Sequence, residues 1–278
     1  MPAFDTPEPI SVTLDMGSGD VQVIAEDRTD TLVEVRPADA NDSSDVKAAE
    51  QASVEFDGRV LVIKTQKPRA MSRKSWTVDV SIVLPTGSHV RGEVAMGDLR
   101  CSGRLGGCNF KTPAGHIQLD HVSSMRVKTS AGDIIVGRVD GAAEVNTANG
   151  RLRIGEIGGT AEVRNSNGST EIGKVIGDIT VRCSNSQISI DHALGSTTDA
   201  ATSNGSIRVG EVTHGTVVLK TSAGDLEVGI GAGHPAKLDL TTGFGRVHNM
   251  LENTVESSEK SIGVRAHTSY GDIRIKRA

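Results

Sequence analysis

A phrase of about ten residues returns along this chain at a nearly constant interval. It reads Val127-Lys-Thr-Ser-Ala-Gly-Asp-Ile-Ile-Val136 in one copy and Leu219-Lys-Thr-Ser-Ala-Gly-Asp-Leu-Glu-Val228 in another. We call the central glycine of the phrase the anchor, and it falls at Gly97, Gly115, Gly132, Gly150, Gly168, Ser186, Gly205, Gly224, Gly245 and Gly271. The steps between these anchors are 18, 17, 18, 18, 18, 19, 19, 21 and 26 residues. Such a step predicts the stacked coils of a β-solenoid, because one coil is too short to bury a core alone.

Apolar residues alternate with polar ones around each anchor. They stand five positions before it (Phe110, Val127, Val145, Val163, Val181, Leu219), two positions after it (Ile117, Ile134, Leu152, Ile188, Ile207, Leu226, Val247, Ile273) and four positions after it (Leu119, Val136, Ile154, Ile172, Ile190, Val209, Val228, Ile275). Alternation with period two indicates strands that bury one face. Stacked aliphatic side chains fill a narrow core without aromatic residues, which make up 2% of the chain. We therefore predict an all-β, single-stranded, β-helix-like solenoid of about 18-residue coils.

Polar residues also recur at fixed positions. Three positions before the anchor the chain has mainly threonine: Thr112, Thr129, Thr147, Asn165, Cys183, Thr202, Thr221, Thr242 and Thr268. Directly before the anchor it has alanine or asparagine: Ala114, Ala131, Asn149, Asn167, Asn185, Asn204 and Ala223. We expect the threonine and asparagine side chains to hydrogen-bond along the stack. The anchor glycine predicts a tight corner with positive φ.

The first ninety residues follow the repeat less regularly. The segment 1–9 contains three prolines and is predicted to be an extended leader. Strands are expected at about 31–36, 53–56, 59–65 and 76–84, with a hairpin turn at Asp57-Gly58 and a polar loop at about 66–74. A helix is expected at 43–52, with Ser43 or Ser44 as its N-cap. We interpret residues 10–90 as an N-terminal cap and 91–278 as regular repeats that form one continuous domain with it.

No comparable cap follows the last repeat. The sequence therefore predicts an open edge at the C-terminus, formed by Tyr270, Ile273 and Ile275. An open strand edge can pair with another chain, and a head-to-head dimer is the closed way to do so.

The repeated phrase, with a first copy at Ser18-Gly-Asp-Val-Gln-Val23, resembles that of the DUF4097 "putative adhesin" β-strand repeat family, also called the toastrack domain. The resemblance covers about residues 10–278. It implies a β-helix-like, non-catalytic module, in relatives often associated with the cell envelope or with membrane-stress operons. By this resemblance we expect binding to a protein or to an envelope-associated partner.

Composition and the N-terminus bear on location. The net charge of −5 gives no overall attraction to nucleic acid or anionic membrane. No stretch approaches the roughly 20 apolar residues of a membrane span, and the N-terminus lacks the pattern of a secretory signal. The three cysteines, Cys101, Cys108 and Cys183, are expected to be reduced. Together these features predict a cytoplasmic protein.

The sequence offers little chemistry. Eight histidines are scattered without a second ligand set beside them, so we predict no metal and no cofactor. Aspartates that directly follow anchors are expected to cap turns rather than to bind calcium: Asp20, Asp98, Asp133, Asp225 and Asp272. We predict no enzymatic activity, and a carbohydrate-active β-helix enzyme remains the less favoured alternative.

One surface feature suggests an interaction. Basic residues recur four positions before the anchor, at Lys111, Lys128, Arg164, Arg182 and Lys220. We call them the basic stripe. Either nearby acids such as Glu144 and Glu162 neutralise it, or it docks an acidic partner surface, anionic lipid or nucleic acid. Two functions therefore compete: a scaffold that binds a protein partner, and a structural protein that self-assembles through its C-terminal edge.

Overall fold

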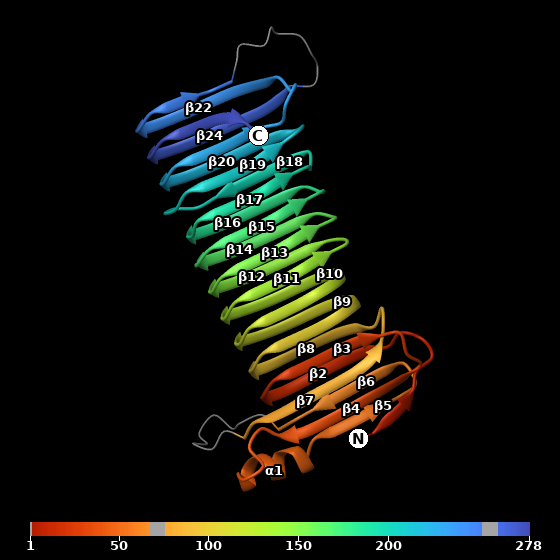
Figure 1. Ribbon diagram of the computed structural model, residues 1–278. Coiled ribbons are helices and arrows are strands. Elements are labelled where there is room, and N and C mark those ends of the chain that lie inside the picture. The colour runs from red at the N-terminus through yellow and green to blue at the C-terminus, as the bar shows by residue number, and fades with distance from the viewer. Residues whose placement is uncertain (1, 67–75, 252–260) are drawn as a thin grey trace. The chain divides into compact units, whose positions relative to one another are not determined.

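The computed structural model describes residues 2–66, 76–251 and 261–278 (Figure 1). This part of the chain is almost entirely β-strand and contains one helix. It divides into two compact units, Met1–Arg138 (unit 1) and Val139–Ala278 (unit 2). The all-β solenoid predicted from the repeat is confirmed within each unit, and the domain boundaries expected from the sequence stay a prediction. The loop expected at 66–74 lies almost wholly outside the described residues.

Unit 1 carries the less regular part of the sequence. Its elements are β1 (Ala3–Asp5), β2 (Ser11–Ser18), β3 (Val21–Glu26), β4 (Asp30–Pro37), α1 (Ser43–Glu50), β5 (Ser53–Phe56), β6 (Val60–Lys64), β7 (Val78–Pro85), β8 (His89–Met96), β9 (Leu99–Ala114), β10 (Ile117–Ala131) and β11 (Ile134–Val139), whose last residue belongs to unit 2. The long strands β9 and β10 pair in parallel, with Val127 opposite Phe110 and Thr129 opposite Thr112. Residues at equal distance from their anchors therefore stack, as the repeat predicts.

The first coil of unit 1 is not its outermost coil. β2 lies between β6 and β8, and β3 lies between β7 and β9, all in parallel. The coil that begins the repeat is thus enclosed by two coils that come later in the sequence.

Antiparallel strands cover the outermost parallel pair of unit 1. β5 pairs with β6, β4 pairs with β7, and β1 pairs with β4, so the segment expected to be a leader supplies a strand. The hairpin turn is confirmed: Gly58 has φ of 95°, and the Asp57 carboxylate accepts the N–H groups of Arg59 and Val60. These two hydrogen bonds lower the pKa of Asp57.

Helix α1 packs against β4 and β7. The helix forms where the sequence predicts it, but the expected N-cap at Ser43 or Ser44 is wrong. Asp42 is the N-cap, and its Oδ1 accepts the Ser44 N–H at 2.7 Å. A carboxylate one residue earlier provides this acceptor and also carries the negative charge that a helix N-terminus favours.

Unit 2 carries the most regular repeats. Its remaining strands are β12 (Ala143–Asn149), β13 (Leu152–Ile157), β14 (Ala161–Asn167), β15 (Thr170–Val175), β16 (Ile179–Asn185), β17 (Ile188–Ala193), β18 (Thr197–Ala201), β19 (Ile207–Val212), β20 (Thr216–Ala223), β21 (Leu226–Ile230), β22 (Ala236–Phe244), β23 (Val247–Asn249), β24 (Ile262–Tyr270) and β25 (Ile273–Arg277). The even-numbered strands β12 to β20 pair in parallel on one face, and the odd-numbered strands β13 to β21 pair on the other.

The core of unit 2 consists of the predicted aliphatic residues. Val145, Val163 and Val181 stand opposite one another on successive coils and are buried. Each fully buried aliphatic side chain contributes about 1.5–3 kcal/mol. A further buried set, which the sequence reading missed, lies seven positions after the anchor: Ile157, Val175, Ala193 and Val212.

The last coil of unit 2 is also an inserted coil. β24 lies between β20 and β22, and β25 lies between β21 and β23, as Figure 1 shows for β20, β24 and β22. Gly271, the anchor of this coil, has φ of 149°, and a Cβ there would stand 2.1 Å from the Gly224 carbonyl oxygen. The corner therefore requires glycine both for its backbone angle and for its contact with the next coil.

The polar columns behave in two ways. The asparagine ladder is confirmed, since Asn167, Asn185 and Asn204 each donate from Nδ2 to the Oδ1 of the preceding coil's asparagine at 2.9–3.0 Å. Threonine hydroxyls of the repeat also hydrogen-bond along the stack, but to backbone carbonyls of the neighbouring coil. Thr221, for example, donates to the carbonyl oxygen of Gly205, the anchor of the preceding coil, at 3.0 Å.

Candidate functional site

β22 has a neighbouring strand on one side only, within the described part of the chain. The Ile262 N–H donates to the Pro235 carbonyl at 2.9 Å, so residue 235 faces the inner neighbour β24. Alternate residues of a strand direct their backbone groups to the same side. Ala236, Leu238 and Leu240 therefore direct their N–H and C=O groups away from β24. A free row of this kind is a template for a further strand. We call β22 and β23 the outer layer.

The outer layer also exposes side chains that other coils bury. Ala236, Leu238 and Leu240 are half-buried, whereas their partners in the β24 register are at most 2% exposed. Beyond them, Val247 is 44% and Met250 57% exposed. The apolar pattern of the repeat continues into this coil without a following coil to cover it among the described residues.

An aromatic pair lies at the end of β22. Phe244 stands opposite Tyr270 of β24, with the ring centroids 5.0 Å apart and the ring planes 6° from parallel. The side chains are 71% and 60% exposed. The chain has only six aromatic residues, so two of them stacked on the surface form an unusual concentration. Exposed aromatic side chains of this kind are enriched at protein interfaces.

The prediction that the last strands of the sequence form the open edge is wrong. Tyr270, Ile273 and Ile275 belong to β24 and β25, which have strands on both sides, and the two isoleucines are fully buried. The chain reaches the outer layer first and then returns between two coils. Tyr270 alone of the three belongs to the site, through its side chain.

The outer layer carries charges of both signs on its exposed face. Lys237 and Asp239 are exposed on β22, and Asp239 accepts from the Arg265 Nε at 3.1 Å. At the turn into β23, the Arg246 N–H donates to Asp272 at 2.9 Å. This hydrogen bond lowers the pKa of Asp272, and the nearby charges of Arg274 and His248 act in the same direction.

The basic stripe is divided between the two units. Three of its members form ion pairs: Lys111 with Glu93 at 3.3 Å, Arg164 with Glu162 at 2.5 Å and Arg182 with Asp199 at 2.5 Å. Lys128 and Lys220 are exposed and have no ion-pair partner among the described residues. Exposed pairs of this kind contribute at most about 1 kcal/mol. Nearby acids thus neutralise part of the basic stripe, which agrees with the first of the two interpretations. Binding of a partner by the stripe stays a prediction.

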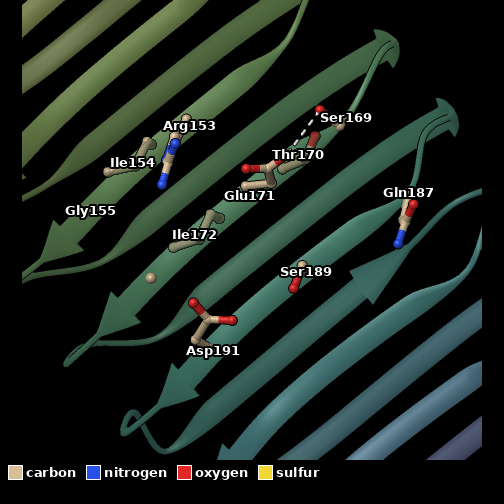
Figure 2. A pocket seen from close by; sticks show the side chains of 11 residues that line it. Arg153, Ile154, Gly155, Ser169, Thr170, Glu171, Ile172, Gln187, Ser189 and Asp191 are labelled. Carbon is tan, nitrogen blue, oxygen red and sulfur yellow. Dashed lines mark hydrogen bonds between the residues drawn. The ribbon is translucent and has the colours of Figure 1, made fainter.

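A shallow polar groove of about 360 Å³ crosses β13, β15 and β17 (Figure 2). Arg153, Glu171 and Asp191 line it, and Ser169 donates to Glu171 at 3.4 Å. Glu171 stands opposite Arg153 and Ser189 in the register, so no second carboxylate faces it across a strand. Asp191 lines the same groove from β17, two residues beyond the Ser189 that stands opposite Glu171.

The other candidate groups serve the fold. No cluster of three or more metal-ligating side chains occurs in the described ranges. The turn-capping role expected for the aspartates is confirmed, since Asp98 accepts the His116 N–H at 2.8 Å and Asp225 accepts the Asp272 N–H at 2.9 Å. Histidine takes the same role once, where the Asp133 N–H donates to His116 Nδ1 at 3.0 Å.

The three thiols differ in their surroundings. Cys101 and Cys108 face the core from β9, and burial raises the pKa of Cys101 well above its ordinary value and that of Cys108 to about 12. Cys183 is half-buried, and burial raises its pKa as well. Such thiols are unreactive, because the thiolate is the nucleophile. Over the ranges that the structure describes, no helix has the length and apolar character needed to cross a membrane.

Several solved structures are similar to this chain. A "putative adhesin" from Bacteroides fragilis aligns over 99% of this chain and 95% of its own at 12% identity, with a TM-score of 0.41. A "putative lipid binding protein" from Parabacteroides distasonis aligns over 98% and 95% at 13% identity, with a TM-score of 0.41. A "putative cell adhesion protein" from Clostridium sporogenes aligns over 100% and 98% at 12% identity, with a TM-score of 0.22. No protein-family model and no curated protein matches the sequence. The resemblance to DUF4097 therefore stays a prediction.

Proposed function

We propose that this chain is a non-enzymatic interaction scaffold, of the adhesin-like or toastrack type, which binds a protein partner through the outer layer of unit 2. The observation that carries the proposal is the edge of β22 that has no strand beside it in the described residues, next to exposed apolar side chains. Backbone groups of an edge strand supply affinity, and the alternating side chains supply specificity. The repeat provides a rigid base for this surface, because the coil next to it, β24–β25, is held by parallel ladders on both sides.

The same observation favours a protein over a lipid surface as the partner. Phe244 and Met250 are exposed as a membrane-inserting tip would require. However, the N–H and C=O groups of Ala236, Leu238 and Leu240 would enter the apolar phase without partners, at a cost of several kcal/mol each. An added strand satisfies these groups, whereas lipid does not.

A second candidate function, self-assembly, is favoured by the same edge, since an unpaired strand can also pair with its own copy. A carbohydrate-active enzyme is the weaker alternative, because no aromatic side chain of the described residues lines the groove of Figure 2 to stack on a sugar ring. A screen of polysaccharide substrates that showed turnover, lost in Glu171→Gln, would revive it. The cytoplasmic location also stays a prediction.

Partner capture with matched variants tests the proposal. The immobilised protein is exposed to extract of its source cells, and retained proteins are compared between wild type and Phe244→Ser/Tyr270→Ser. We expect a partner that wild type retains and the double variant loses by at least tenfold. The control is Lys128→Glu/Arg164→Glu/Arg182→Glu, which reverses three of the five charges of the basic stripe and leaves the outer layer intact. Equal capture by wild type and the aromatic variant, with folding verified by circular dichroism, would contradict the proposal. Loss of the partner only in the stripe variant would show that the basic stripe is the binding surface.

A further inference from the structure

We propose that the occupant of the outer layer is a second copy of this chain, with β22 of each copy paired antiparallel about a two-fold axis at Leu238. This inference rests on the proposed function and specifies the partner. It follows from the direction of the backbone groups of β22 and from the order of charges along it.

The backbone groups limit the ways in which two β22 strands can meet. Ala236, Leu238 and Leu240 direct their N–H and C=O groups outward, as the Ile262–Pro235 hydrogen bond requires. In an antiparallel pair, residues with outward groups must stand opposite each other to exchange both hydrogen bonds. An axis at Leu238 places Leu238 opposite itself and Ala236 opposite Leu240 of the second copy. Every outward group in this stretch then has a partner.

The charges select this register from its neighbours. With the axis at Leu238, Lys237 stands opposite the second copy's Asp239, and the pair occurs twice. An axis at Lys237 would place two lysines opposite each other, and an axis at Asp239 would place two aspartates opposite each other. An axis at Leu240 would place Asp239 opposite Thr241 and form no ion pair. Opposite charges across a strand pair stabilise it, and like charges destabilise it.

The apolar face agrees with the same register. The half-buried Leu238 and Leu240 point to the core side of β22, where they continue the column of Val264 and Ala266. A second copy would place Leu238 and Ala236 against them and complete the burial that other coils have. Because the contact uses the same surface on both copies, it closes at two chains and gives no filament.

Charge reversal in two separate variants tests the register. Light scattering coupled to size exclusion measures the mass of wild type, Lys237→Asp and Asp239→Lys over a concentration series, alone and mixed. We expect a dimer of the 29.1 kDa chain for wild type. Each variant alone should dimerise roughly tenfold more weakly or worse, because like charges then meet across the axis. An equimolar mixture should restore a one-to-one dimer, because the two aspartates of one variant then face the two lysines of the other. Lys220→Asp, which changes an exposed lysine on the doubly paired β20, should leave the dimer unchanged.

A backbone variant tests the pairing without charge. Leu238→Pro removes the outward N–H at the axis and leaves the ladder to β24 with its donors, so it should give a folded monomer. A wild type that is monomeric at every concentration, or a mixture that does not associate, overturns the second copy as occupant. If the aromatic variant still loses a partner in that case, the proposed function stands and only this inference fails. Flotation of wild type with anionic liposomes would assign the surface to lipid and contradict both.

Discussion

In unit 1 the outermost parallel strands, β6 and β7, are covered by the antiparallel strands β5 and β4, whereas in unit 2 the outermost β22 has a described strand on one side only. The covered layer buries its core-facing aliphatic residues completely, for example Leu61 and Ile63 at 0% exposure. The outer layer of unit 2 leaves Leu238 and Leu240 half-buried. Two coils built from similar residues therefore differ in whether their edge is available to another chain.

The two units agree in a second respect. Each holds the repeat nearest its own end of the sequence, β2–β3 or β24–β25, between two other coils. A terminal strand with one neighbour would fray, and a strand with two neighbours is held along both edges. Enclosing the inserted coil between two neighbours and covering the outermost strands are therefore separate properties. Unit 1 shows both properties, whereas unit 2 shows only the enclosed coil among its described residues.

The largest effect is expected at the anchors of the two inserted coils. A Cβ at Gly19 would stand 1.9 Å from the Val78 carbonyl oxygen, and a Cβ at Gly271 would stand 2.1 Å from that of Gly224. Both glycines also have positive φ, at 140° and 149°. We expect Gly19→Ala and Gly271→Ala each to destabilise the protein by about 3 kcal/mol or more, since backbone must move. Urea unfolding followed by circular dichroism measures this.

Gly58→Ala is the matched control for the two anchors. Gly58 has φ of 95° but nothing within 4 Å of a Cβ, so only the backbone angle is penalised, at about 1 kcal/mol. Equal losses at Gly58 and Gly271 would show that contact between coils is unimportant. A loss at Gly19 alone would show that the inserted coil of unit 2 is not tightly held.

The covered and open layers should differ next most strongly. Ile63→Ala empties a fully buried position and should cost about 2–5 kcal/mol. Leu240→Ala, at a half-buried position, should cost about 1 kcal/mol in the monomer. Thermal unfolding at protein concentrations below the dimer dissociation constant compares the stability losses of the two variants. A cost for Leu240 that matches Ile63 would mean that the outer layer is covered in solution.

The stability of α1 and the antiparallel strands of unit 1 should depend on one carboxylate. Asp45 is 7% exposed, and it accepts the N–H of Thr77 at 2.7 Å and the N–H of Asp39 at 3.2 Å. Asp45→Ala leaves both donors without an acceptor and should destabilise unit 1 by about 1–3 kcal/mol. Hydrogen exchange should increase in β4 and β7 and stay unchanged in unit 2. Asp45→Asn keeps one acceptor and should recover part of the loss.

The sequence predicts the coils well and their order poorly. The spacing of the anchors places Val145, Val163 and Val181 in one column, and the structure confirms that column. The spatial order of the last coils depends instead on the lengths of the segments that connect them. Thr221, Thr242 and Thr268 would stack equally well in any order of the three coils. The longer steps of 21 and 26 residues after Gly224 were the available signal, since only long connections let the chain pass one coil and return. The candidate site was missed for this reason: the anchor Gly245, beside Phe244, is followed in the sequence by a further anchor at Gly271, which predicts an interior coil.

The smallest effect concerns an ion pair that joins the inserted coil to its neighbour. Glu227 of β21 lies 2.8 Å from Lys276 Nζ of β25, and this contact lowers the pKa of Glu227 below its ordinary value of 4.5. A lowered carboxyl pKa adds stability above 4.5 that is lost as the pH falls through the folded-state value. Glu227→Gln should therefore be less stable than wild type at pH 7 by less than about 1 kcal/mol, because the pair is partly exposed. The two stabilities should converge as the pH falls below the lowered pKa of Glu227. Glu171→Gln, on β15, is the control and should show a smaller difference. A loss above about 2 kcal/mol at pH 7 would mean that charge, rather than the backbone ladder on both sides, holds the inserted coil in place.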